Sequence, residues 1–196
     1  MARRGPKRDD AARRRILDAT RDLICEYGPG RVTINQITAD ARVGKQTIYR
    51  WWPSRSALVV DALADLVEEQ AFIEVEGNTS ETAKQAVAHH MRRLADTFAS
   101  PAGAMIRELV SDAQRDPAVA GLFHQRFLHD RRARATAILQ QGIEHGELRD
   151  DLSIDTMLDV LYAPFWFRLL LDEKRLSPDL GQEILDIVWP GLSPQP

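Results

Sequence analysis

The chain has 196 residues, of which 44% are hydrophobic and 28% charged, which excludes wholesale disorder and fits a globular protein. Its single cysteine, Cys25, excludes an intrachain disulfide, and we expect a cytoplasmic protein. The net charge of −3 is uneven, because residues 1–60 carry 13 Lys and Arg against 6 Asp and Glu, whereas the remaining residues carry 13 against 23. A basic front end of this kind predicts a polyanionic partner.

The first predicted helix starts at Asp9 or Asp10 and is ended by Gly28. We expect Cys25 to pack inside this helix. The apolar spacing predicts that one side faces inward, formed by Ile16, Thr20, Leu23 and Tyr27.

Two short helices follow, joined by a tight turn. Thr33 and Gln36 have the spacing of a capping box, which starts the first of them. A turn at 42–44 leads into the second, predicted over 45–52 and ended by Pro53. A longer helix followed by two short ones with a three-residue turn is typical of a helix-turn-helix.

The two sides of this helix pair differ in polarity. The apolar positions expected to pack together are Ile34, Ile37, Ala41, Val43, Ile48 and Trp52. The outer face holds Lys45, Gln46, Thr47, Tyr49 and Arg50, and polar side chains of these types bind base edges and phosphates. A lysine at a helix N-terminus is mildly unfavourable, so we expect DNA phosphate to supply the missing counter-charge.

The remaining sequence also reads as helices. Ser54 is predicted to cap a fourth helix to about residue 70, the only expected connection between the helix-turn-helix and the rest. Later helices are predicted to open at Ser153 and at the pairs Ser100-Pro101, Asp116-Pro117 and Ser177-Pro178. We predict an all-α protein of about nine helices, with a helix-turn-helix domain at 1–53 and a helical bundle at 54–196. The most apolar run, 161–171, is too short to cross a membrane.

The stretch "TINQITADARVGKQTIYRWWPSRSAL", residues 33–58, resembles the helix-turn-helix signature of the TetR family of transcriptional regulators. Arg42 departs from that pattern, standing where a turn glycine is common, and Gly44 stands where Ser or Thr usually caps the helix. The resemblance implies roles in double-stranded DNA binding for Thr33, Tyr49 and Arg55 at phosphates and for Lys45, Gln46, Thr47 and Arg50 near the bases. Although they depart from the pattern, Arg42 is expected to add a phosphate contact and Gly44 to begin the DNA-binding segment. The arm "MARRGPKR" is either a minor-groove contact or a solubilising tail.

The second domain is expected, by the same resemblance, to bind an effector and to form a homodimer. Candidates for the effector pocket are Phe98, Met105, Phe123, His124, Phe127, Tyr162 and Trp166. Such stripes are more often plain core, and that alternative stays open. The helix over 154–171 and the last helix both have wide apolar faces that resemble the family's dimer-forming pair. The residues expected at this interface are Leu158, Leu161, Phe165, Leu169, Ile184 and Val188.

We therefore expect a regulator, a repressor released from DNA by a small hydrophobic or amphipathic effector. The alternative is a DNA-binding regulator controlled by a protein partner without a small-molecule effector. An all-α enzyme using His124, His129 and Asp130 ranks far behind, since the sequence shows no nucleophile or metal-ligand motif. No cofactor and no metal are expected.

Overall fold

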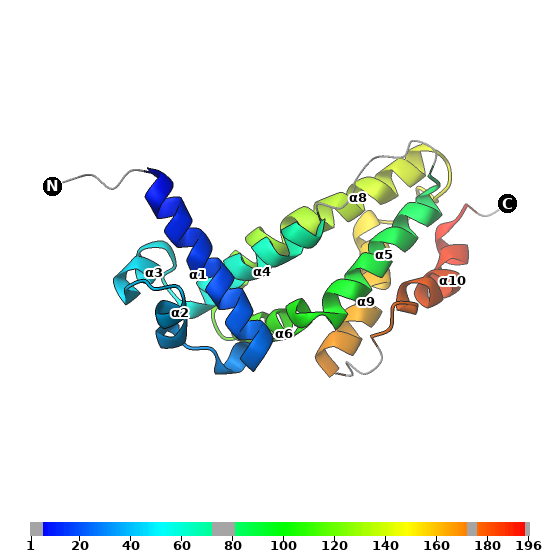
Figure 1. The fold of residues 1–196 in the computed structure, drawn as a ribbon. Coiled ribbons are helices and arrows are strands. Elements are labelled where there is room, and N and C mark those ends of the chain that lie inside the picture. Colours follow the sequence, from blue (N-terminus) through cyan, green and yellow to red (C-terminus); the bar gives the residue numbers. More distant parts are fainter. Residues whose placement is uncertain (1–5, 72–80, 172–175, 195–196) are drawn as a thin grey trace. The chain divides into compact units, whose positions relative to one another are not determined.

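The structure, a computed structural model, describes residues 6–71, 81–171 and 176–194. Those residues form helices and no strands, so the predicted all-α class is confirmed (Figure 1). The bounds are α1 Pro6–Tyr27, η1 Pro29–Arg31, α2 Ile34–Asp40, α3 Lys45–Trp51, α4 Arg55–Ala71, α5 Ala83–Ala99, α6 Pro101–Ala113, α7 Pro117–Phe123, η2 His124–Leu128, α8 His129–Glu144, α9 Ile154–Leu171 and α10 Leu180–Leu192.

Helices α7 and α8 are joined without a break by η2, a π-helical turn. When this run is taken as one helix and the single turn η1 is left aside, the described residues form nine helices. None of the described helices combines the length and the apolar character that crossing a membrane requires.

The chain divides into two compact units, and each unit is formed by two separate segments that alternate along the sequence. The first unit holds α1 to α4 together with residues 104–127, which are most of α6, all of α7 and all of η2 except Leu128. The second unit holds α5, the start of α6, α8, α9 and α10. The helix-turn-helix thus shares its unit with α6 and α7, which corrects the expectation that α4 is its only neighbour outside 1–53. The expected division at residue 53 stays a prediction.

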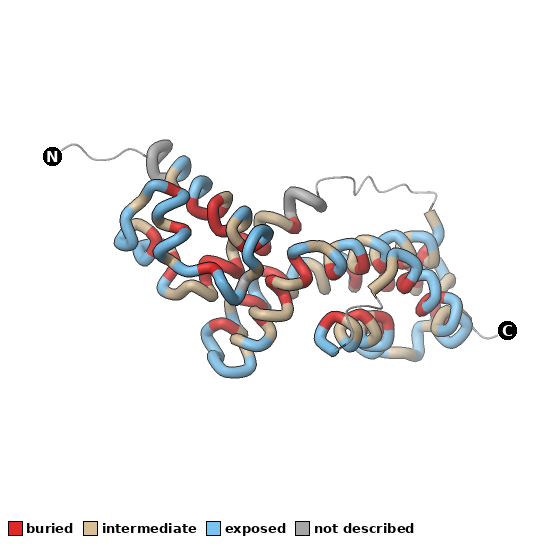
Figure 2. The backbone as a smooth tube through the Cα atoms, turned by 60° about the horizontal axis from the view of Figure 1, so that its bottom comes forward, coloured by how far each residue is buried: buried red, intermediate tan, exposed pale blue. Residues whose placement is uncertain are grey.

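Apolar side chains of α1 to α4 form the core of the first unit. Ile16, Ile37, Ile48 and Leu58 are fully buried, one from each of these helices. In Figure 2 the buried positions of this unit lie on the sides of the helices that face one another. The spacing of apolar residues that predicts helices therefore also brings α2 and α3 together beside α1.

In the second unit, α5 lies against α8, α9 and α10 (Figure 1). Its buried positions Val87, Met91 and Phe98 repeat at intervals of three to four residues or their multiples, as an amphipathic helix requires. Gly181 of α10 lies so close to Met91 that an added Cβ would come within 2.9 Å of the Met91 Cβ. The small residue therefore allows α10 to approach α5.

Several predicted helix ends are confirmed by hydrogen bonds. The Ala57 amide donates to Ser54 Oγ at 3.1 Å, and the Ala102 amide donates to Ser100 Oγ at 3.1 Å. The amide of Ala118 donates to Asp116 Oδ1 at 2.9 Å. These caps were predictable because each one is made within three residues of the helix start.

Other local predictions were wrong. Helix α1 starts at Pro6, one turn before the expected acids, because proline is well suited to the first position of a helix. Tyr27 is 46% exposed and Cys25 is also exposed, since the buried side of α1 turns to Leu17 and Ile24 instead. The last helix begins at Leu180 after Asp179, not at the Ser177-Pro178 pair.

Candidate nucleic-acid interface

Local bonds fix the start of α2 and the turn that leads from α2 to α3, where the Val43 amide donates to the Thr38 carbonyl oxygen at 3.1 Å. Thr33 and Gln36 form the predicted capping box, in which the Gln36 amide donates to Thr33 Oγ1 and the Thr33 amide donates to Gln36 Oε1 at 2.8 Å. Gly44 is the N-cap of α3, with no side chain to cap it. Arg42 has a φ of +53°, the left-handed conformation that glycine adopts most readily. An exposed arginine is therefore held in the turn at a conformational cost.

Helix α3 presents a polar outer face. Ile48 is fully buried, whereas Lys45, Gln46 and Arg50 are exposed and Tyr49 is 51% exposed. Thr47 is half-buried. The structure therefore brings the predicted DNA-contacting side chains of α3 together on and beside one open face. A face of this chemistry can enter a major groove and meet base edges and phosphates.

Trp52, directly after α3, anchors this helix in the first unit. Its ring is 3% exposed, and its indole Nε1–H donates to Asp61 Oδ2 of α4 at 2.9 Å. The same oxygen accepts from Arg13 Nη2 of α1 at 3.1 Å, and Arg126 Nε of η2 lies 3.8 Å from Asp61 Oδ1. Trp51 packs edge-on against Trp52 with ring centroids 5.6 Å apart. One carboxylate thus connects the end of α3 to three other helical segments.

Arg55, whose expected place at DNA phosphate stays a prediction, makes internal bonds in this structure. Its Nε donates to the Val32 carbonyl oxygen at 2.7 Å, and its Nη1 pairs with Glu108 Oε1 of α6 at 2.7 Å. Next to it, Ser56 Oγ donates to Asp112 Oδ2 at 2.9 Å. The guanidinium therefore links the start of α2 to α6.

The predicted effector residues are divided between the two units. In the first unit, Met105, Phe123 and Phe127 are buried, and the rings of Phe123 and Phe127 stack with centroids 5.2 Å apart. His124 is exposed at the start of η2. In the second unit, Phe98 packs edge-on against the half-buried Trp166 at 5.1 Å.

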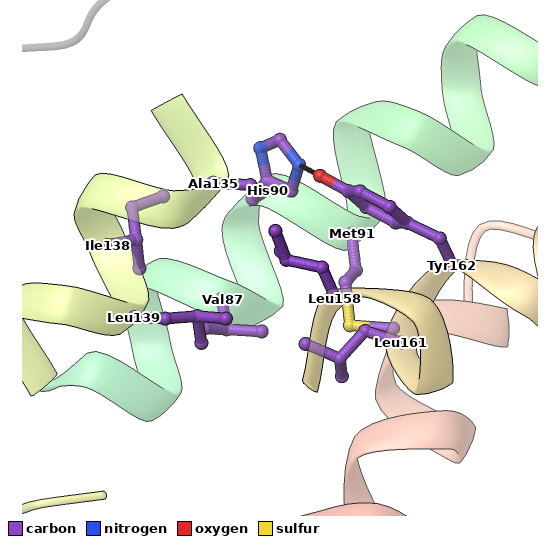
Figure 3. A pocket seen from close by; sticks show the side chains of 9 residues that line it. All are labelled: Val87, His90, Met91, Ala135, Ile138, Leu139, Leu158, Leu161 and Tyr162. Atoms are coloured by element: carbon purple, nitrogen blue, oxygen red, sulfur yellow. Dashed lines mark hydrogen bonds between the residues drawn. The ribbon is translucent and has the colours of Figure 1, made fainter. Parts of the chain in front are cut away.

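Tyr162 lines a small cavity of about 10 Å³ between α5, α8 and α9. Beside it lies His90, whose Nε2 is 2.5 Å from the Tyr162 hydroxyl oxygen (Figure 3). Burial, together with the charges of Arg93 and Arg134, lowers the pKa of His90 from 6.5 to about 4. Burial raises the pKa of Tyr162 to about 12, against the opposing effect of Arg132. Both groups are therefore uncharged at neutral pH.

The residues expected at the dimer interface lie mostly in the core of a single chain. Leu158, Leu161, Phe165, Leu169 and Ile184 are all buried, and Val188 is half-buried. Because they face their own unit, their exposed neighbours replace them as interface candidates: Val160, Phe167, Leu170, Leu171 and Ile187. A helix that is apolar on all sides gives no sequence signal of which side faces out.

Sequence reasoning missed two polar residues, Asp61, which accepts from Trp52, and His90, which bonds Tyr162. A carboxylate inside the otherwise apolar stretch of α4 was the available signal for Asp61. For His90 the available signal was its place next to His89, because adjacent helical residues point in different directions; His89 is exposed, whereas His90 lines the cavity. Residues 1–5 of the basic arm lie outside the described residues. In the part of the chain that the structure describes, no cluster of His, Cys, Asp and Glu could hold a metal ion.

Comparison with known proteins gives matches to both parts of the chain. Residues 16–62 match the profile "Bacterial regulatory proteins, tetR family", and residues 79–188 match "Tetracyclin repressor-like, C-terminal domain". The uncharacterized HTH-type transcriptional regulator YdeS of Bacillus subtilis is 34% identical over 192 residues, covering 98% of this chain and 95% of that protein.

Solved structures agree with these matches. The TetR family transcription regulator SCO0332 superposes with a TM-score of 0.75 at 25% identity, over 93% of this chain and 99% of that one. FadR of Bacillus subtilis, solved in complex with stearoyl-CoA, gives a TM-score of 0.73 at 18% identity, over 91% and 98% of the two chains. The second similarity concerns the fold alone.

Proposed function

Because the chain belongs to the TetR family of transcriptional regulators and carries that family's DNA-binding domain, we propose that it is a repressor that binds a pseudo-palindromic operator as a homodimer. A small hydrophobic or amphipathic effector releases it. The observation that carries the proposal is α3, whose polar side chains lie open on one face while Ile48 fixes the other in the core. Acting on DNA, the protein works in the cytoplasm.

The homodimer is supported by the apolar side chains that one chain leaves exposed on α9 and α10. Phe167 is 59% exposed, Leu171 74% and Ile187 80%. Val160, Phe167 and Leu171 repeat at intervals of seven and four residues, so they share one side of α9. A two-fold dimer formed through such a face presents two α3 helices to two half-sites, as a pseudo-palindrome requires.

An amphipathic effector is supported by the fold relationship with FadR of Bacillus subtilis, which was solved with stearoyl-CoA. Further support comes from the apolar interiors of both units of this chain. A ligand that binds one conformation better than another shifts operator affinity by the same factor by which the operator shifts ligand affinity. Effector couplings of this sort amount to about 1–3 kcal/mol.

The DNA proposal is tested by letting the protein select a duplex from a random-sequence pool and measuring affinity against salt. We expect a two-fold symmetric sequence. Lys45→Ala should weaken binding to all duplexes and reduce the salt slope by about 0.9 per lost contact in each subunit. Gln46→Ala and Thr47→Ala should relax base preference instead. If slope and preference stay unchanged in all three variants, the assignment of α3 is wrong.

The dimer is tested by light scattering of Phe167→Glu, which should be monomeric. Tyr27→Glu is the matched control, since Tyr27 is also an exposed aromatic residue but lies on α1 of the other unit. The control should remain dimeric. A dimeric Phe167→Glu protein would place the interface elsewhere.

A further inference from the structure

The cavity of the second unit has one polar feature in apolar surroundings. Seven of its nine lining residues have apolar side chains: Val87, Met91, Ala135, Ile138, Leu139, Leu158 and Leu161. The other two are His90 of α5 and Tyr162 of α9, joined by their hydrogen bond at the edge of the cavity (Figure 3). The pair is therefore the part of the cavity wall that can form directional hydrogen bonds, whereas the other lining residues offer only apolar contacts.

The pair can donate a hydrogen bond to a third group. An uncharged imidazole has one N–H, and the phenol has one O–H. When His90 Nε2–H donates to the tyrosine oxygen, the Tyr162 O–H stays available for another acceptor. The positive charges of Arg93 and Arg134 reach His90, and that of Arg132 reaches Tyr162. Because Arg132 is itself paired with Asp155 and Asp159, these charges do not decide between a neutral and a negatively charged acceptor oxygen.

Stability alone does not account for the pair. Burying polar groups costs free energy that their hydrogen bond only offsets, and an apolar pair of similar shape is often as stable or more so. A few convergent polar groups in an apolar pocket are instead the usual composition of a site that orients a ligand. Tyr162 was an effector candidate from the sequence, and the structure adds His90 as its partner.

We propose that the His90–Tyr162 niche binds a hydrophobic molecule by one hydrogen-bond-accepting oxygen, a carbonyl or a carboxylate, with its hydrocarbon part among the leucines of α8 and α9. This inference rests on the proposed function, because it names the chemical class of the effector. The cavity has room for about one water molecule, so the ligand enters by moving apolar side chains apart. Contacts of this kind have no fixed direction and re-form around a new occupant.

Three probes of one shape test the oxygen requirement: 4-butylbenzoate, 4-butylacetophenone and butylbenzene. Their binding to the full chain without DNA is measured by calorimetry. We expect the two oxygen-bearing probes to bind at least five to ten times more tightly than butylbenzene, the factor that one hydrogen bond supplies. The order of the first two shows whether the charged or the neutral oxygen is preferred, and either order supports the proposal.

Two variants assign the effect to the pair. Tyr162→Phe removes only the hydroxyl and should lower the affinity for both oxygen-bearing probes five- to tenfold while leaving butylbenzene unchanged. His90→Leu should do the same. His89→Ala is the matched control, because the side chain of His89 is 75% exposed and its Nδ1 lies 3.0 Å from Glu81. This control should bind all three probes as the unsubstituted chain does.

Equal binding of the three probes, absence of binding by all of them, or an unchanged affinity in Tyr162→Phe would overturn the proposal. None of these results concerns the selection of a symmetric duplex, which is measured separately. A chain that still selects such a duplex and is released by a molecule of another class would keep the proposed function and lose only this assignment.

Discussion

The surroundings of α3 in the first unit differ from those of the cavity in the second. In the first, polar side chains tie the DNA-reading segment to its neighbours: Trp52 donates to Asp61, Arg55 bonds Val32 and Glu108, and Ser56 bonds Asp112. Hydrogen bonds and ion pairs are directional, so they fix the orientation of α3 as well as its position. A surface that must match the spacing of base edges needs this precision.

In the second unit, ion pairs at the surface also join helices, such as Arg132 of α8 with Asp155 and Asp159 of α9, but the cavity wall is apolar except for a single polar pair, His90 with Tyr162. Apolar contacts are not directional, so they can rearrange around a new occupant at little cost in lost bonds. On the proposed function, the first unit holds α3 in a fixed orientation, whereas the side chains around the cavity of the second unit rearrange when a ligand binds. The following predictions test it, from the largest expected effect to the smallest.

Trp52→Ala should destabilise the first unit most. Removing a buried indole leaves a cavity and costs about 3–5 kcal/mol, and it also leaves Asp61 without its indole donor. Urea unfolding followed by hydrogen exchange should show α1 to α4 opening before α5 and α8 to α10. Trp51→Ala is the control, since Trp51 is only half-buried. An equal loss in both variants would mean that Trp52 is not the anchor of α3.

The stability of the second unit should depend on pH through His90. The pKa of His90 is about 4 in the folded chain, against the ordinary histidine value of 6.5, so between these values the unfolded chain binds more protons. Unfolding free energy should therefore fall as pH is lowered from about 6.5 towards 4, by about 1–3 kcal/mol for this half-buried group. Denaturant unfolding at several pH values checks this. His90→Gln should lose the dependence in that window and His89→Gln should keep it.

Asp61→Ala should test whether directional bonds orient α3. The buried indole N–H of Trp52 would lose its acceptor, at about 1–3 kcal/mol. Affinity for the selected duplex should fall more than affinity for a scrambled duplex of equal length, because misorientation affects base contacts more than phosphate contacts. Asp61→Asn keeps an acceptor oxygen and should recover most of the loss in specificity. If the affinity for both duplexes fell equally, Asp61 would stabilise the first unit without orienting α3.

The same contrast explains which features the sequence could predict. The capping box of Thr33 with Gln36 and the caps at Ser54, Ser100 and Asp116 are made within a few residues, so their patterns are visible in the sequence. The pairing of Arg55 with Glu108 joins residues 53 positions apart and depends on how α4 and α6 pack. Likewise, only packing decides which side of the apolar helix α9 is buried, so the side expected outside was found inside.

Replacing Arg42 should have the smallest effect on stability, but stability and duplex affinity should change in opposite directions. A non-glycine residue in the left-handed region is strained by about 1–2 kcal/mol, and part of that strain is relieved in Arg42→Gly, offset by the greater freedom of glycine in the unfolded chain. We expect a gain of about 0.5–1 kcal/mol in unfolding free energy, measured by urea titration. Affinity for the selected duplex should nevertheless fall, with a salt slope smaller by about 0.9 per subunit, because an exposed guanidinium at the turn is lost.

The control for this prediction is Arg42→Ala, which removes the charge and keeps the strain. It should lose duplex affinity to the same extent without any gain in stability. A stabilised Arg42→Gly protein with unchanged duplex affinity would show that the strained turn has no part in DNA binding. If Arg42→Gly instead raises the unfolding free energy and lowers the duplex affinity, the strained turn reduces the stability of the first unit and holds a cation beside α3. Such strain persists because the surrounding hydrogen bonds fix the turn.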